Sequence, residues 1–297
     1  MSAIRGRIAR AMLAVLAMAG LLVAVGVTAA FWPTARVALH RLDSNWLGER
    51  VMDTMTRIRG DEDWSRAAPL RPAQDYGWLR AAGRPVRIAH ALGAAGRPTA
   101  NTLGAMRRAY AAGFRLLEVD LVDEGGELHC QHDPGPQGDL VKDGCTLDTL
   151  LEAVPPDAWL VLDIKTDFAA VGQRIVDRVT GTADAKRIVF QLYRPGDFAL
   201  FNRWQEQASL PGPILTAYLA HRRIDHVATQ ASRIGVTAFT LPLDRLPALT
   251  ASPIGATVLA HPVHNCAAWA QAVRRAGGVY TLSSLRCGAS SQHAPSP

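Results

Sequence analysis

The chain has 297 residues, of which 48% are hydrophobic and 20% are charged, so it can bury a sizeable core. This composition excludes disordered, collagen-like and coiled-coil proteins. The net charge is +6, but residues 1–41 carry five arginines and no acid, which leaves the remainder nearly neutral and predicts no nucleic-acid partner.

The first predicted element is a membrane anchor within residues 1–35. No charged residue lies between Arg10 and Arg36, and a helix over Ala11–Phe31 would have 21 residues. At about 1.5 Å per residue, this helix spans the ~30 Å hydrocarbon layer. The arginines before it favour a cytoplasmic amino terminus and a domain on the periplasmic side. A cleaved signal peptide is the alternative, although the apolar run is longer than a signal sequence needs.

A stem or linker is predicted over residues 36–83. Its first part, residues 36–59, has apolar residues at helical spacing. Its second part, residues 60–78, is polar and contains prolines, which is typical of a linker or of a lid over the rim of the next domain. That domain is predicted over residues 84–288, and residues 289–297 are predicted to form a disordered tail.

From Val86 onward, short apolar runs alternate with amphipathic segments, which predicts parallel strands joined by crossover helices. The nine expected strands are 87–91, 116–121, 128–133, 159–165, 187–192, 213–219, 237–243, 257–263 and 279–285.

The second and third of these strands are too close in sequence for a parallel crossover, which needs about a dozen residues. Gly125 and Gly126 between them predict a hairpin turn instead. Without this returning strand, eight strands remain. We therefore predict a (β/α)₈ TIM barrel with an extra hairpin strand, preceded by the transmembrane helix and stem, and keep an open doubly wound sheet as the alternative.

Polar side chains interrupt or end several of the early strands. Functional residues of a TIM barrel lie at the carboxyl ends of its strands, so these positions form the candidate site. Because residues two apart on a strand point to the same face, the acids of Glu-x-Asp at 118–120 share one face. The candidates are His90, Glu118, Asp120, His132, Asp133, Asp163 and Lys165.

Three carboxylates at one end of an apolar barrel would repel one another and lose hydration. A divalent cation with hard oxygen ligands relieves both costs, so Glu118, Asp120 and Asp163 predict one Mg²⁺ or Ca²⁺ site. The alternatives are solvated acids, a strand-end cap at His132–Asp133, and a rim ion pair between Asp163 and Lys165.

Residues 87–165 resemble the glycerophosphodiester phosphodiesterase family, within the phospholipase-C-like phosphodiesterases. That family reads A-H-R-G, P-E-N-T, E-x-D, a short D-G hairpin, H-D and E-x-K in this order. The matching positions here are His90, Asn101-Thr102, Glu118 and Asp120, Gly125-Gly126, His132-Asp133, and Asp163 with Lys165. Beyond Lys165 only the rhythm of the strands matches.

The departures from the family pattern define a divergent H-A-x-G branch. Ala91 replaces the arginine that follows the first histidine, Leu92 replaces a glycine, and Ala100 replaces the glutamate of P-E-N-T. The third acid is Asp163 instead of Glu. Without the arginine fork, phosphate must be held by the cation, Lys165 or another side chain.

The resemblance implies a metal-dependent hydrolase of glycerophosphodiesters or phospholipid-derived headgroups. His90 and His132 would be its general base and acid, and Lys165 would contact the substrate phosphate. In the family, a substrate hydroxyl can attack phosphorus first and give a cyclic phosphate. The alternative is a non-catalytic envelope barrel that binds such a ligand without turnover.

Four residues on later strand ends are weaker candidates for phosphate contacts, and we interpret them first as ordinary rim residues. They are Arg194, His221, His261 and His264.

The four cysteines suit an exported domain, because they are even in number and form neither C-x-x-C nor a zinc-site spacing. Buried thiols are the alternative to two disulfides. The order of the strands places Cys130 near Cys145, and Cys266 near Cys287. Among the possible pairings we therefore favour 130–145 with 266–287.

Overall fold

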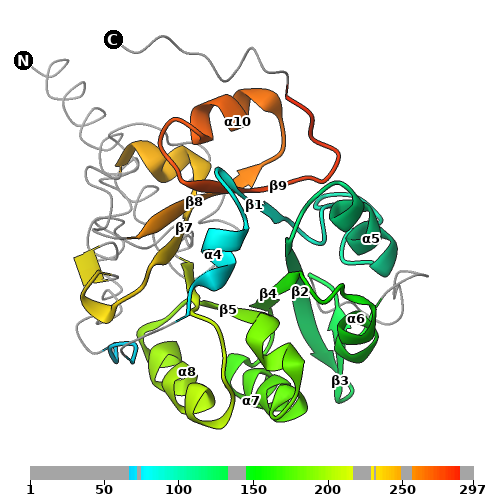
Figure 1. The fold of residues 1–297 in the computed structure, drawn as a ribbon, viewed down its shortest axis with the longest axis vertical. Coiled ribbons are helices and arrows are strands. Elements are labelled where there is room, and N and C mark those ends of the chain that lie inside the picture. The colour runs from blue at the N-terminus through cyan, green and yellow to red at the C-terminus, as the bar shows by residue number, and fades with distance from the viewer. Residues whose placement is uncertain are drawn as a thin grey trace, which may run out of the picture. The chain divides into compact units, whose positions relative to one another are not determined.

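Eight parallel strands close into a barrel in the computed structural model (Figure 1), which describes residues 67–71, 75–132, 145–216, 229–230, 232–248 and 256–287. Neighbouring strands follow the order β1, β2, β4, β5, β6, β7, β8, β9, and β9 pairs with β1. This closure confirms the TIM barrel and excludes the open sheet. The barrel strands are β1 (Val86–Ala89), β2 (Leu116–Glu124), β4 (Trp159–Ile164), β5 (Ile188–Leu192), β6 (Ile214–Thr216), β7 (Ala238–Pro242), β8 (Thr257–Val263) and β9 (Gly278–Thr281).

The remaining strand, β3 (Glu127–Cys130), returns antiparallel to β2, with Leu121 opposite Cys130. The turn between them places Gly125 and Gly126 at φ values of 62° and 88°. These left-handed conformations are accessible to glycine without steric cost, which explains the tight turn. The extra hairpin strand is therefore confirmed.

Helices cover the outer face of the barrel (Figure 1). Side chains cap the first turns of several of these helices; for example, Thr102 accepts a hydrogen bond from the Ala105 N–H. The amphipathic face of α7 buries Val171, Ile175 and Val179 against the sheet. The outer helices are α5 (Leu103–Ala111), α6 (Leu147–Ala153), α7 (Phe168–Val179), α8 (Pro195–Gln207) and α10 (Cys266–Ala272), with 3₁₀ helices η2 (Ala183–Arg187) and η3 (Leu243–Ala248).

A short helix before the barrel, α4 (Gly77–Ala81), belongs to its interior packing. Tyr76 and Trp78 are buried in one cluster with the first residues of four strands, so they close the amino-terminal end of the barrel. The Tyr76 hydroxyl donates to the Pro213 carbonyl at 3.0 Å, and Trp78 Nε1 donates to the Gly212 carbonyl at 3.0 Å. Residues 75–78, which we predicted as part of a linker or lid, therefore pack against the amino-terminal end of the barrel.

The parts of the chain predicted as membrane anchor, amphipathic stem helix and disordered tail lie outside the described residues, except for the end of the stem. Among the residues that the structure describes, no helix is both long and apolar enough to cross a membrane.

Two disulfides join Cys130 to Cys145 and Cys266 to Cys287, as the order of strands predicted. The first disulfide joins the end of β3 to the start of α6, and its two cysteines are 15 positions apart in the sequence. In the chain-entropy model, closing a loop of about 15 residues stabilises the fold by ~3 kcal/mol.

We expect the oxidised protein, denatured without reductant, to expose no reactive thiol. Reduction should lower the free energy of unfolding by about 3 kcal/mol for the first disulfide alone. Thiol labelling before and after reduction counts the reactive thiols. Urea unfolding of a Cys130→Ser/Cys145→Ser variant measures the change in the free energy of unfolding. Four reactive thiols in the unreduced protein would contradict the pairing.

Candidate active site

Three buried carboxylates meet at the carboxyl end of the barrel. Glu118 and Asp120 lie on β2, Asp163 lies on β4, and the parallel register places Asp120 beside Asp163. Their side chains offer oxygen atoms that all lie within 4.8 Å of one another. The residues are only 2%, 2% and 4% exposed, so water does not stabilise their charges. The predicted convergence of the three acids is confirmed.

The loop after β1 directs a backbone donor at Glu118. The Ala91 N–H donates to Glu118 Oε2 at 2.6 Å, while Ala91 and Leu92 adopt φ values of 50° and 57°. Such left-handed conformations cost about 1–3 kcal/mol for residues other than glycine. The loop keeps this conformation with Ala91 and Leu92, at the two positions where the resembled family has Arg and Gly.

Asp120 is oriented by an amide side chain. Asn101 Nδ2 donates to Asp120 Oδ2 at 2.8 Å, and the Asp120 N–H donates to Asn101 Oδ1 at 3.2 Å. Asn101 itself has a φ of 56°, in the left-handed region that asparagine tolerates better than most residues. Of the two carboxylate oxygens of Asp120, Asn101 contacts Oδ2 and leaves Oδ1 to other partners.

Lys165 and Tyr193 contact the other side of the acidic group. Lys165 Nζ lies 3.0 Å from Asp120 Oδ1 and 2.7 Å from Asp163 Oδ2. The Tyr193 hydroxyl donates to Asp163 Oδ1. The ion pair that we kept as an alternative for Asp163 and Lys165 is present, but it forms inside the site and includes Asp120.

One ammonium does not neutralise three carboxylates. Burial raises the pKa of Glu118 well above its ordinary value, and the charges of Asp120 and Asp163 raise it further. A divalent cation would offset this repulsion, and carboxylate oxygens are the ligands that Mg²⁺ and Ca²⁺ prefer. The donor set therefore fits a hard divalent cation.

Three histidines form a chain of contacts beside the acids. His90 Nδ1 lies 2.9 Å from His264 Nε2, and His90 Nε2 lies 3.1 Å from His261 Nε2. Both ring nitrogens of His90 thus have an imidazole partner. His261 and His264, which we interpreted first as rim residues, are brought to the predicted catalytic histidine.

Burial, together with the charges of His264 and Lys165, lowers the pKa of His90 to about 3. Burial also lowers the pKa values of His261, whose shift is large, and of His264. The imidazole of His90 is therefore uncharged at neutral pH, in the form that can accept a proton.

His132 lies just beyond β3 and is exposed. Its charge contributes to the lowered pKa of His90, so it lies within electrostatic reach of that ring. Asp133 and the loop that follows it lie outside the described residues, as does His221, whereas Arg194 caps the start of α8.

A buried polar layer lies across the middle of the barrel. The Tyr280 hydroxyl donates to Gln191 Oε1 at 2.9 Å, and the Thr216 hydroxyl donates to the same oxygen at 3.1 Å. Sequence reasoning missed these residues and Tyr193. The signal that reveals them is the one that found the acids, namely a polar residue inside or directly after an apolar strand run.

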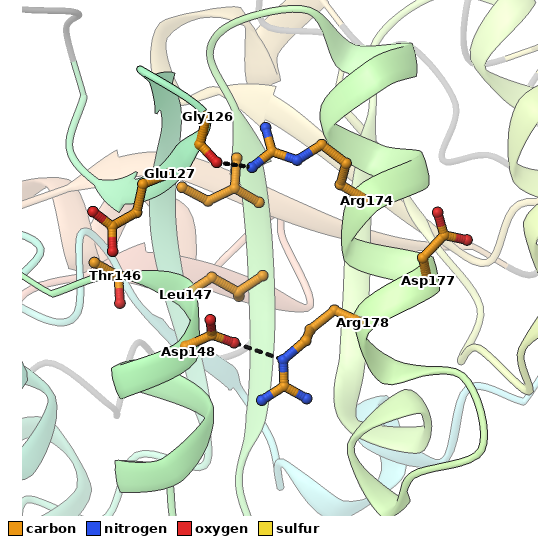
Figure 2. A pocket seen from close by; sticks show the side chains of 9 residues that line it. Gly126, Glu127, Thr146, Leu147, Asp148, Arg174, Asp177 and Arg178 are labelled. Carbon is orange, nitrogen blue, oxygen red and sulfur yellow. Dashed lines mark hydrogen bonds and ion pairs between the residues drawn. The ribbon is translucent and has the colours of Figure 1, made fainter.

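A separate cleft of about 320 Å³ lies on the outer wall, between the β2–β3 hairpin, α6 and α7 (Figure 2). Its two α7 arginines are already paired: Arg174 contacts Asp123 and the Gly126 carbonyl, and Arg178 Nε lies 2.6 Å from Asp148 Oδ1. An anion would have to displace these partners, so the barrel end is the stronger candidate site.

No family model and no curated protein matches the sequence. Solved structures do match. A glycerophosphodiester phosphodiesterase from Thermotoga maritima has a TM-score of 0.50 and 15% identity, over 66% of this chain and 93% of that one. One from Parabacteroides distasonis has a TM-score of 0.51 and 16% identity, over 66% and 91%. At this identity the matches show a shared fold, which agrees with the resemblance of residues 87–165.

Proposed function

We propose that the chain is a divalent-cation-dependent phosphodiesterase that hydrolyses glycerophosphodiesters or phospholipid-derived headgroups. The observation that carries the proposal is the group of Glu118, Asp120 and Asp163, buried within 4.8 Å of one another at the barrel end beside His90. The phosphodiesterase fold and the ordered motifs of residues 87–165 support it.

The three acids would hold the cation, Mg²⁺ or Ca²⁺, which supplies positive charge to the phosphodiester oxygens when bound. Lys165 would add a second positive charge beside the transferring phosphoryl group. Asn101 and the Ala91 N–H position the acids, because each donates to one carboxylate and fixes its rotamer.

His90 would accept the proton of the attacking hydroxyl, and His132 would donate a proton to the leaving oxygen. The lowered pKa of His90 keeps its ring uncharged at neutral pH. Its contact with the partly buried His264 is the one that a substrate can displace, whereas its contact with His261 would keep the ring oriented.

A non-catalytic barrel that binds the same ligand is the second candidate. The specific observation in its favour is that other imidazoles engage both ring nitrogens of His90. The substitutions Ala91 and Ala100, at positions where the resembled family has Arg and Glu, point the same way.

Hydrolysis of bis-p-nitrophenyl phosphate and glycerophosphocholine, with added Mg²⁺ or Ca²⁺ and with EDTA, separates the two candidates. We expect turnover that requires the cation. Binding of the diester, without turnover in either cation, would identify the non-catalytic barrel.

We also propose that residues 1–35 anchor the protein with its barrel on the periplasmic side. The uncharged run from Ala11 to Phe31 and the arginines before it support this orientation. We expect mass spectrometry of the purified membrane fraction to find this segment attached to the mature protein. An amino terminus near Ala30 would identify a cleaved signal peptide instead.

A further inference from the structure

Among the residues that the structure describes, no helix covers the outer wall of the barrel at the junction of β1 and β9. Parallel barrel strands bury their outer face under helices, usually one after each strand. In the described part of the chain after β9, residues 282–287 form no helix. A groove of about 560 Å³ lies there, and Figure 1 shows this junction between α5 and α10.

Three arginines line this groove, and none of its lining residues is acidic. Within the described residues, none of Arg84, Arg87 and Arg286 forms an ion pair. The ten residues that follow Cys287 contain no Asp or Glu, so their side chains offer no counter-charge. The arginines of the cleft in Figure 2, in contrast, are paired with carboxylates.

Two of these guanidinium groups are held in place. Arg87 lies over the Phe114 ring at 4.8 Å from its centroid. Arg286 Nη1 donates to the carbonyls of Ser283 and Leu285, at 2.7 and 3.1 Å. An ordered guanidinium loses less entropy when it binds an oxyanion, which its fork of N–H groups suits.

A buried hydroxyl lies in the same wall. Thr281 lines the groove, is 1% exposed, and its Oγ1 has no hydrogen-bond partner. A buried polar atom without a partner costs about 1–3 kcal/mol, which a ligand oxygen would recover. The hydroxyl is a second observation, independent of the arginines, that points to a polar ligand.

The rest of the lining is apolar and includes Phe114, Trp269, Leu282 and Leu285. We propose that the groove binds a phosphate ester that carries an apolar group, such as a phosphatidate. The phosphate contacts the arginines and the Thr281 hydroxyl, and the apolar group lies against Trp269 and its neighbours. The site lies outside the barrel end and does not depend on the proposed hydrolysis.

Calorimetric titration with phosphatidate bearing two six-carbon chains, below its micelle concentration, tests this site. EDTA in every sample keeps a divalent cation from the carboxylates of the barrel end. We expect saturable binding of one ligand per chain, and at least about tenfold weaker binding by an Arg84→Ala/Arg286→Ala variant, since hydrogen bonds to charged groups contribute most to affinity. Arg178→Ala, in the cleft of Figure 2, is the matched control and should bind normally.

Thr281→Val preserves the shape of the side chain and should weaken binding while the ligand-free protein stays folded. Inorganic phosphate should bind more weakly than the phosphatidate, because it leaves the apolar lining unused. Vesicles of phosphatidylglycerol test whether the groove also binds a lipid that lies in a bilayer. Loss of vesicle binding in the double arginine variant would show that it binds such lipid headgroups as well. Absence of saturable binding, an equal loss in Arg178→Ala, or binding to vesicles alone would overturn the proposal.

Discussion

Replacement of Glu118 with glutamine is expected to reduce cation-dependent phosphodiester hydrolysis by about 10³-fold, because the cation contributes several kcal/mol to catalysis. Glutamine keeps the size of the side chain but removes one of three charges that lie within 4.8 Å. The initial rate on bis-p-nitrophenyl phosphate, measured across Mg²⁺ and Ca²⁺ concentrations, gives the size of the loss.

The same variant should lose stabilisation by the cation, which is a readout independent of activity. A ligand present at about 100 times its dissociation constant raises the free energy of unfolding by ~2.7 kcal/mol. Glu152→Gln is the matched control, because Glu152 is an exposed residue of α6. It should keep both the rate and the cation-induced rise in melting temperature. An unchanged rate in Glu118→Gln would exclude the three-carboxylate site from catalysis.

Replacement of His90 with alanine is expected to lower turnover by at least about 10²-fold, the usual contribution of a general acid or base. His90 contacts both of the other histidines, His264 at 2.9 Å and His261 at 3.1 Å. Steady-state kinetics of His90→Ala measure the loss. His129→Ala, which removes a histidine paired with Glu127 on β3, is the control and should keep its turnover.

The lowered pKa of His90 also predicts that the free energy of unfolding depends on pH. Its folded-state pKa, about 3, lies below the ordinary 6.5, so below pH 6.5 the unfolded chain binds a proton that the folded protein does not. The stability that His90 contributes is present above pH 6.5 and is lost as the pH falls toward 3. Urea unfolding at pH 7.5 and 4.5 should show a smaller loss for His90→Ala than for the parent. Equal losses would place a charged, hydrated imidazole at this position.

Much of the fold was predictable because its signals are local. The short connection around Gly125 and Gly126 excluded a parallel crossover and left eight barrel strands. Glu118 and Asp120 lie two apart on one strand, and residues at this spacing share a face whatever surrounds them. The disulfide partners lie at the ends of neighbouring elements, 15 and 21 residues apart.

Contacts across the closed barrel were not predictable in the same way. His261 and His264 lie 171 and 174 residues from His90. They reach it because β9, between β8 and β1, brings the last strands next to the first. Tyr76 and Trp78 likewise belong to a polar segment, and only the apolar end of the barrel explains why they are buried.

The sequence by itself determined the eight parallel strands, the extra hairpin strand and the acids at one end of the sheet, because strand periodicity and connection length are properties of the local chain. The tertiary structure alone decided that the strands close into a barrel, that two imidazoles contact His90, and that three arginines line one groove at the junction of β1 and β9. The imidazole contacts and the groove depend on which strands become neighbours when the barrel closes, and burial of its core against solvent determines that closure.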